Sequence, residues 1–368
     1  MNRQPVRNAP TTDPAATQAA APSSLTVLKK SGSRQRYRFF APLCGLLIAL
    51  IVTEIVVRSI EHFSAAHPKR HDRPERFHYP ENNRKWRDFS YTEEKPANTF
   101  RMIVLGDSFT AGTGVQFDDT FSKRLERLLN MGSGPLKAEV LNFGVPGYNT
   151  VQEEMLFKKA VVRQPDLALL EITLNDAEMQ PFRVAFPNFD PSGEKLLRKP
   201  IFQWWRTAAF VAQRLINTES HRFYIKYHQS LFEEPESWKR FSSAIVAMRD
   251  VARANKIKFA AVVFPMFSYP IDEHYPFWSV HTKINGLLDD LGVDHLDLAK
   301  SFEGIPPARL QILPGADSHP NEIGHRIAAD RIYAWLHRRE IVPATLKPAI
   351  ELHGQKNGGK PSHQEHVK

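Results

Sequence analysis

The sequence predicts an α/β domain built on a parallel sheet with helices on both faces, preceded by one membrane-spanning helix. Three observations predict this architecture. From about residue 99, short apolar runs alternate with longer segments whose apolar residues recur at helical spacing, which is typical of parallel sheets. Polar turns containing glycine follow several of these runs, where open α/β sheets bind ligands. One apolar stretch nearer the N-terminus has the length of a bilayer span.

Composition limits the classes of protein to consider. The 368 residues, 42% of them hydrophobic, are enough for one large domain or two ordinary ones with a sizeable core. Of the net charge of +9, residues 1–40 carry +6 and residues 341–368 carry +2, which leaves +1 for the body. The basic charge therefore lies in the tails, and no nucleic-acid partner is expected. With Cys44 as its single cysteine, the chain has no intrachain disulfide and no cysteine metal cluster.

The N-terminal part divides into a tail and an anchor. Residues 1–36, rich in Pro, Ala, Ser and Thr, are expected to be disordered. Residues 37–58 are the expected anchor, because Phe39 to Val57 is apolar apart from Glu54 and spans roughly 28 Å as a helix. A buried soluble helix or a cleaved signal peptide is the alternative. The polar residues that precede the run argue against a signal peptide, which normally begins near the N-terminus.

Basic residues on the two sides of the anchor indicate its orientation. More of them lie before it (Lys29, Lys30, Arg34, Arg36 and Arg38) than after it (Arg58, Lys69 and Arg70). The bias favours a cytoplasmic N-terminus. We therefore expect a single-pass protein of the inner (cytoplasmic) membrane, with its body outside the cytoplasm.

Residues 59–98 are polar and are interpreted as a juxtamembrane stem. His67 and His71 in this stem have a spacing that holds metals on helices. Pro68 lies between them, however, and no third ligand is evident. A solvated stem is the preferred interpretation.

Residues 99–340 carry the alternating pattern and form the expected catalytic domain. Its expected strands are Arg101–Leu105, Glu139–Asn142, Leu167–Ile172, Phe259–Phe264 and Asp294–Leu298. Its expected helices lie near 117–130, 149–163, 238–255, 281–291 and 321–338. An aromatic-rich insertion at 180–240, expected to be helical near 200–216, is either a satellite core or a lid or substrate wall. Residues 341–368 form a polar tail.

The segment Met102–Val115 reads as a buried strand, a tight glycine turn and a helix, with Ser108 directly after the turn. It is no phosphate loop, because Ala111 stands where the second glycine would be and no lysine follows. It is no nucleophile elbow either, because Thr110 replaces that motif's second glycine. Ser108 is therefore either a helix cap or a nucleophile of another family.

Three further polar loops supply what a nucleophilic serine needs. Gly147 lets a backbone N–H approach a ligand, and Asn175 offers an amide donor. Asp317 would hold His319 in the correct tautomer, and His319 would accept the serine proton. Taken singly, these residues are as well explained as turn formers or helix caps. Together, four polar loops at the carboxyl ends of one sheet indicate one site.

On these four loops, which lie within about residues 100–338, the chain resembles the GDSL/SGNH hydrolase family. Gly106-Asp107-Ser108-Phe109 resembles the family's nucleophile block, and Gly147 matches its oxyanion glycine. Asn175-Asp176 matches its Asn-Asp block, and Asp317 with His319 matches its acid–base block.

The chain departs from the family pattern at three places. Phe109 replaces the name-giving leucine, and Thr173 stands where the family usually has glycine. One residue separates Asp317 from His319, whereas the family usually has two. The shorter link changes the approach of Asp317 to the histidine.

The resemblance implies a three-layer α/β/α flavodoxin-like fold and serine ester hydrolysis without a cofactor or metal. Ser108 would attack the ester carbonyl, with His319 as general base and then general acid, and Asp317 as its partner. The Ser108 N–H, the Gly147 N–H and the Asn175 side chain would hold the oxyanion.

Location and resemblance together predict the substrate, an O-acyl (acetyl) group on a cell-envelope or extracellular glycan. Three alternatives stay open. A lipid-ester hydrolase, similar to a lysophospholipase, would use the insertion as an interfacial lid. An O-acyltransferase would pass the acyl group to a sugar hydroxyl. A non-catalytic glycan-binding module would keep only the fold. The expected partners are thus an acylated glycan or lipid ester, and a membrane through residues 37–58.

Two other groups of residues have the right chemistry but a simpler explanation. Asp294, His295 and Asp297 lie on an expected strand, where neighbouring side chains face opposite sides. His325 falls inside the last expected helix. We expect structural roles for all four.

Overall fold

The computed structural model describes residues 34–66, 88–132 and 134–346. The chain forms two compact units, which meet in the sequence after Ala66 and are described separately. The predictions for residues 1–33, for His67 and His71 in the stem, and for the tail from 347 onward lie outside the described residues. The predicted domain boundaries stay predictions.

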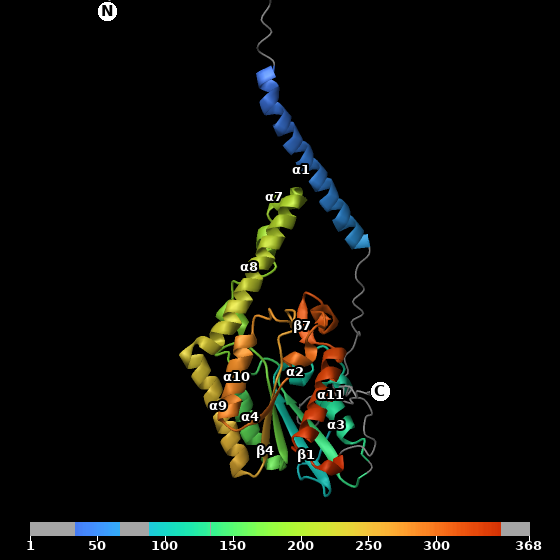
Figure 1. Ribbon diagram of the computed structural model, residues 1–368, viewed down its shortest axis with the longest axis vertical. Helices are drawn as coiled ribbons and strands as arrows, with labels where there is room; N and C mark the ends of the chain where they lie inside the picture. The colour runs from blue at the N-terminus through green and yellow to red at the C-terminus, as the bar shows by residue number, and fades with distance from the viewer. Residues whose placement is uncertain (1–33, 67–87, 133, 347–368) are drawn as a thin grey trace, which may run out of the picture. The chain divides into compact units, whose positions relative to one another are not determined.

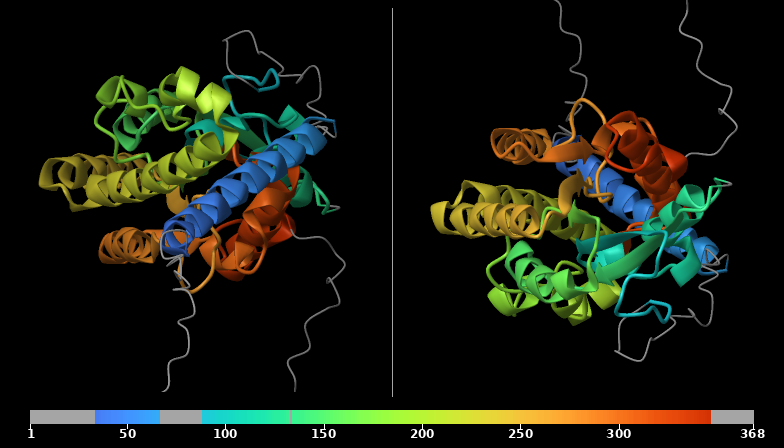
Figure 2. Two further views of the ribbon diagram at one scale, coloured as in Figure 1. Left: turned by 90° about the horizontal axis from the view of Figure 1, so that it is seen from above. Right: turned by 90° about the horizontal axis from the view of Figure 1, so that it is seen from below.

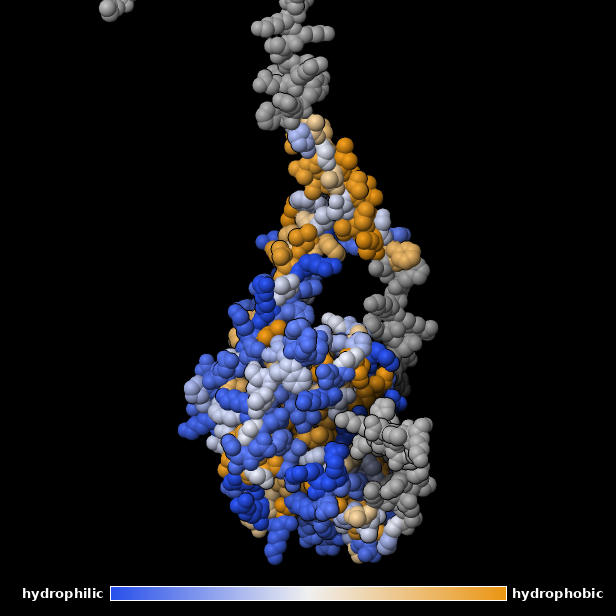
Figure 3. Space-filling model, viewed as in Figure 1, coloured by the Kyte–Doolittle hydropathy of each residue, from blue (hydrophilic) through white to orange (hydrophobic). Residues whose placement is uncertain are grey.

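The N-terminal unit is one helix, α1 (Arg34–Ala66). Its segment Phe40–Phe63, 24 residues long, is sufficiently long and apolar to cross a membrane, by length and composition. Figure 3 shows apolar side chains along most of this helix. Glu54, the acid within the apolar run, pairs at 2.8 Å with Arg58 one turn later. These features make α1 a candidate membrane span.

The second unit contains a five-stranded sheet in the order β2-β1-β3-β4-β5, with every neighbouring pair parallel. Its strands are β1 (Thr99–Gly106), β2 (Lys137–Gly144), β3 (Leu167–Ile172), β4 (Lys258–Val263) and β5 (Asp294–Asp297). This is the flavodoxin-like strand order, whose direction of winding reverses between β1 and β3. The loops after these two strands therefore border the crevice in which such sheets bind ligands.

Helices cover both faces of the sheet, so the predicted three-layer fold is confirmed. On one face lie α3 (Phe121–Leu129) and α11 (Glu322–Arg338); on the other lie α4 (Thr150–Ala160), α9 (Pro235–Ala254) and α10 (Trp278–Asp290) (Figures 1 and 2). Side chains that accept backbone N–H groups define the starts of three of them. These caps are Thr120 for α3, Asn149 for α4 and Asn321 for α11.

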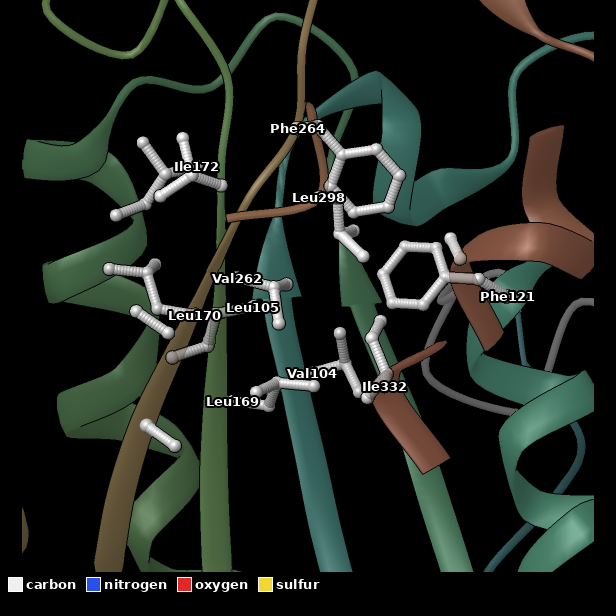
Figure 4. Packing of buried hydrophobic residues seen from close by; sticks show 14 of the residues in the cluster. Val104, Leu105, Phe121, Leu169, Leu170, Ile172, Val262, Phe264, Leu298 and Ile332 are labelled. Carbon is white, nitrogen blue, oxygen red and sulfur yellow. The ribbon is translucent and has the colours of Figure 1, made fainter. Parts of the chain in front are cut away.

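The core lies on both sides of the central strands. Consecutive strand residues point to opposite faces, so β1 and β3, each buried on both sides, are almost wholly apolar. Figure 4 shows Leu170 and Ile172 on the side of α4, and Phe121 and Ile332 on the opposite side. Because β1 is packed on both faces, its end, which Ser108 follows, is held in place.

The insertion between β3 and β4 is more helical than the sequence suggested. It comprises α5 (Phe182–Ala185), α6 (Glu194–Leu197), α7 (Pro200–Trp204) and the long α8 (Arg206–Glu233). Helix was expected near 200–216, but α8 continues to Glu233 because no glycine or proline occurs before Pro235. Several of its aromatic rings pack against one another, for example Phe189 on Phe223 at 4.6 Å between centroids.

Short elements complete the domain. The strands β6 (Gln311–Leu313) and β7 (Asp317–Pro320) form an antiparallel ribbon, and α2 (Ser108–Ala111) is one turn of helix. The 3-10 helices are η1 (Phe117–Asp119), η2 (Val161–Arg163), η3 (Ala299–Phe302), η4 (Pro307–Arg309) and η5 (Ala344–Leu346).

Candidate active site

The turn after β1 presents Ser108 as the first residue of α2, and Asp107 caps the helix. The Asp107 carboxylate accepts the N–H of Phe109 at 2.8 Å. The helix-cap explanation for Ser108 is therefore wrong. The helix lies directly on the end of β2, where a Cβ on Gly144 would stand 2.1 Å from the nitrogen of Ala111. Only glycine permits this approach.

The hairpin β6–β7 brings a histidine and a carboxylate to this serine. His319 Nε2 lies 2.9 Å from Ser108 Oγ, and His319 Nδ1 lies 2.6 Å from Asp317 Oδ1. The His319 backbone N–H donates to the same Asp317 oxygen at 3.1 Å. Asp317 and His319 are on a strand, where residues two apart share one face. The shortened spacing thus still joins the two side chains.

Asn175 reaches the same site through Asp107. Its Nδ2 donates to Asp107 Oδ2 at 2.9 Å, and its Oδ1 accepts the hydroxyl of Thr173 at 2.6 Å. The threonine at the position where glycine was expected therefore sets the orientation of the amide. One of the two Nδ2 hydrogens is used by Asp107, which leaves the second for another acceptor.

Gly147 lies in the loop between β2 and α4 and has a φ of +80°. A Cβ there would meet nothing within 4 Å. Among the described residues, those that line the pocket around Ser108 do not include Gly147. The structure thus joins Ser108, Asp317, His319 and Asn175 in one set of contacts and leaves Gly147 in an adjoining loop.

A pocket of about 170 Å³ opens at Ser108 and His319. Its wall combines polar groups from three of the four loops with apolar side chains and one histidine of α8. The lining residues are Asp107, Ser108, Phe109, Thr173, Leu174, Asn175, His228, Phe264, Pro265, Met266, Ser318 and His319.

Three buried carboxyl groups lie beneath the turn that carries Ser108. Glu171 accepts the Thr110 hydroxyl at 2.9 Å and the Asp107 N–H at 3.4 Å. Burial, followed by the nearby acidic charges, holds the pKa of Glu171 and of Asp176 well above its ordinary value. The same causes raise the pKa of Glu153. The neutral form of these acids is therefore favoured beneath Asp107.

Sequence reasoning overlooked several of these residues. Glu171 carries a weak signal, as the one acidic residue in the otherwise apolar strand LALLEI. His228 carries none, because it lies within a long helix, far along the chain from the four loops. No motif in the sequence links it to Ser108.

The other groups weighed in the sequence have structural contacts. His325 is fully buried, accepts the N–H of Phe121 at 3.1 Å, and has a pKa lowered to about 3 by burial. Asp294 pairs with Arg339, and Asp297 contacts His281 at 3.0 Å. Within residues 34–66, 88–132 and 134–346, no group of three or more His, Cys, Asp or Glu side chains is arranged to hold a metal.

Comparison with known proteins gives one family match. The model of the GDSL-like Lipase/Acylhydrolase family matches residues 104–327. A comparison with curated proteins found no match.

Several solved structures are similar at low identity. TesA is 12% identical, with 65% of this chain and 98% of that chain covered and a TM-score of 0.40. The esterase EstA from Pseudoalteromonas sp. is 13% identical, with 66% and 100% covered and a TM-score of 0.39. The acetyl xylan esterase AlAXEase is 18% identical, with 64% and 98% covered and a TM-score of 0.41.

Proposed function

Because the chain belongs to the GDSL-like lipase/acylhydrolase family and is an ester-bond hydrolase, we propose that Ser108, His319 and Asp317 are its catalytic triad. The observation that carries this proposal is the contact chain from Asp317 through His319 to Ser108 at the mouth of a pocket. Nucleophile, base and orienting carboxylate each lie within hydrogen-bond distance of the next.

The proposed reaction has two stages. His319 Nε2 takes the proton of Ser108 Oγ as that oxygen attacks the ester carbonyl, and then gives the proton to the leaving alcohol. In the second stage, water attacks the acyl-serine while His319 takes a proton from it; the bond from Ser108 Oγ to the acyl carbon then breaks, His319 returns the proton to Oγ, and the carboxylic acid leaves. Asp317 keeps the Nδ1 proton in place and stabilises the imidazolium.

The oxyanion of each tetrahedral intermediate needs donors that are already in position. The proposed donors are the Ser108 N–H, the Gly147 N–H and the second Nδ2 hydrogen of Asn175. The contact of Asn175 with Asp107 supports this role, since it holds the amide at the nucleophile turn. Removing one such donor typically costs about 10²–10³ in turnover.

The proposed substrate is a short O-acyl group, acetyl above all, on a cell-envelope or extracellular glycan. Pocket size supports a short acyl group: the volume of about 170 Å³ lies below the several hundred Å³ typical of pockets for drug-sized ligands. The candidate span in α1 supports a single membrane anchor, and the excess of basic residues before it supports the further proposal of an inner-membrane protein with its catalytic domain outside the cytoplasm. A reporter fused after Lys368 tests this topology, and a cytoplasmic signal would contradict it.

A lipid ester is the second candidate substrate. It is favoured by apolar side chains on α7 and α8 that remain at least half exposed: Ile201, Trp204, Val211 and Leu215. Such a surface suits contact with a lipid interface. Activity that rises sharply above the aggregation threshold of a lipid ester would select this candidate over the glycan.

The experiment that tests the triad is hydrolysis of an aryl acetate by the solubilised full chain. Ser108→Ala should abolish turnover, while Ser242→Ala, a partly buried serine of α9, serves as the matched control. A serine-reactive phosphonate should add one adduct to the wild type and none to Ser108→Ala. Full turnover by folded Ser108→Ala would contradict the proposal.

A further inference from the structure

One wall of the pocket at Ser108 comes from the insertion. His228, in the carboxyl-terminal half of α8, lines the pocket together with Ser108 and His319. Its side chain is buried, with 7% of the residue exposed. The ring packs edge-on against Phe277 at 6.1 Å between centroids. A histidine from outside the four loops thus contributes to the wall of the pocket that holds Ser108 and His319.

The residues on either side of His228 fix its position. Tyr227 donates its hydroxyl to Glu178 Oε1 at 2.9 Å, just after the Asn175 loop. Gln229 donates its amide to the carbonyl of Pro276 at 2.8 Å. The helix is therefore held at two separate loops of the domain, and His228 stands between these two attachments.

The hydrogen bonds of His228 define its tautomer. Nδ1 lies 2.8 Å from the carbonyl oxygen of Tyr224 one turn earlier. A carbonyl only accepts, so Nδ1 carries the proton, and in the neutral ring Nε2 has a free lone pair. Burial lowers the pKa of His228 to about 4, which keeps the ring neutral at ordinary pH. Within the described part of the chain, no group pairs with Nε2.

A hydrogen-bond acceptor on the pocket wall calls for a donor on the substrate. An acetyl group, the proposed acyl part, has no O–H group, and neither does the ester bond itself. The donor must come from the alcohol part, and a sugar carries hydroxyl groups beside its acylated oxygen. Much of the remaining wall is apolar, with Phe264, Pro265 and Met266, so a buried acceptor left without a donor would be costly.

We propose that Nε2 of His228 accepts a hydrogen bond from a free hydroxyl of the alcohol part of the substrate, so that His228 selects polyhydroxylated alcohols such as sugars. The inference rests on the proposed ester hydrolysis at Ser108 and narrows its substrate class. His228 takes no part in proton transfer. It acts as a specificity-determining residue on the alcohol side of the scissile bond.

The test compares two substrates and a minimal variant. The substrates are a mono-O-acetylated methyl glycoside with free neighbouring hydroxyls and the same glycoside with those hydroxyls methylated. His228→Asn keeps an N–H near the Tyr224 carbonyl and removes Nε2. In the wild type, kcat/KM should favour the hydroxylated substrate by about 3- to 10-fold, the range of one neutral hydrogen bond. His228→Asn should lose this preference, mainly through KM.

Two controls separate selection from a structural effect. His221→Asn makes the same substitution at an exposed histidine of α8 that does not line the pocket, and it should keep the wild-type preference. Aryl acetate, which has no neighbouring hydroxyl, should be hydrolysed by His228→Asn within about twofold of the wild type. Equal losses on all three substrates would overturn the inference, as would a wild type with no preference. A wild type with no preference would overturn the inference even if His228→Asn fails to fold.

The inference and the proposed function fail in different ways. If Ser108→Ala hydrolyses the glycoside as well as the wild type, the serine mechanism is wrong. If Ser108→Ala is inactive while His228→Asn keeps the full substrate preference, the mechanism stands and the role of His228 is refuted.

Discussion

Two histidine–aspartate pairs in this protein share one geometry and differ in what surrounds them. In both, Nδ1 of the histidine contacts the carboxylate, at 2.6 Å between His319 and Asp317 and at 3.0 Å between His281 and Asp297. His319 Nε2 faces Ser108 at the pocket. His281 is almost completely buried between α10 and β5, and among the described residues its Nε2 has no hydrogen-bond partner.

The difference teaches that the carboxylate contact alone does not identify a catalytic histidine. The contact orients the ring and selects its tautomer in either environment. Chemistry also requires a nucleophile at the second nitrogen and space for a substrate. The pair at Asp297 has neither, so we assign it a structural role in joining α10 to the end of β5.

The largest expected effect is a difference in kcat between variants of the two histidines. His319→Asn should lower kcat on an aryl acetate by at least about 10³, because the general base is lost while the N–H toward Asp317 is retained. His281→Asn should leave kcat per folded molecule within about twofold and reduce the free energy of unfolding by about 1–3 kcal/mol. Active-site titration with a phosphonate supplies the folded fraction. A folded but inactive His281→Asn would contradict the assignment of a purely structural role to His281.

Variants of the two aspartates should differ in kcat in the same direction as variants of the two histidines, but less strongly. Asp317→Asn should lower kcat by about 10²–10⁴, because an amide no longer stabilises the imidazolium. Asp297→Asn should keep kcat and lower the melting temperature. Steady-state kinetics and thermal unfolding of both variants measure these effects. Wild-type kcat in Asp317→Asn would show that His319 acts without this partner.

A fall in pH should stabilise the region beneath Ser108 and destabilise the region around Asp297. Burial and neighbouring charge raise the pKa of Glu153, so its contribution to stability is complete below about pH 4.5 and is lost as the pH rises. Glu153→Gln removes the cost of burying a charged carboxylate at this position when the pH is high. We expect its melting temperature to exceed that of the wild type by about 1–3 °C at pH 8, and the excess to shrink toward pH 5. A lower melting temperature at every pH would contradict this.

The smallest effect concerns Asp297. Burial raises its pKa, but the hydrogen bond and charge of His281, with the Ala299 N–H and the Asn285 amide, outweigh burial and lower it. The stabilisation is therefore present above about pH 4 and is lost as the pH falls through the folded-state pKa. The gap in melting temperature between wild type and Asp297→Asn should narrow by about 1 °C between pH 6 and pH 3. A constant gap would show that the charge of Asp297 contributes nothing.

Local patterns in the sequence were sufficient for the layers of the fold. The five strands of the parallel sheet were predicted from the alternation of short runs such as Ile103 to Leu105 with longer segments, and the helices that cover the sheet because their apolar residues recur with a helical period. The strands β6 and β7 were not predicted. Ser108 was singled out because a glycine turn at the end of a strand is also a local feature. Even so, local reasoning left open whether Ser108 is a helix cap or a nucleophile.

Tertiary structure decided the contacts of the site. Ser108 and His319 are 211 residues apart in the chain, and no local pattern sets the distance between their side chains. The strand geometry of β7, which lets Asp317 reach His319 despite the shortened spacing, depends on pairing with β6. The place of His228 depends on where α8 is attached. Periodicity and turn chemistry are properties of neighbouring residues, whereas hydrogen bonds across a pocket exist only once distant segments have packed together.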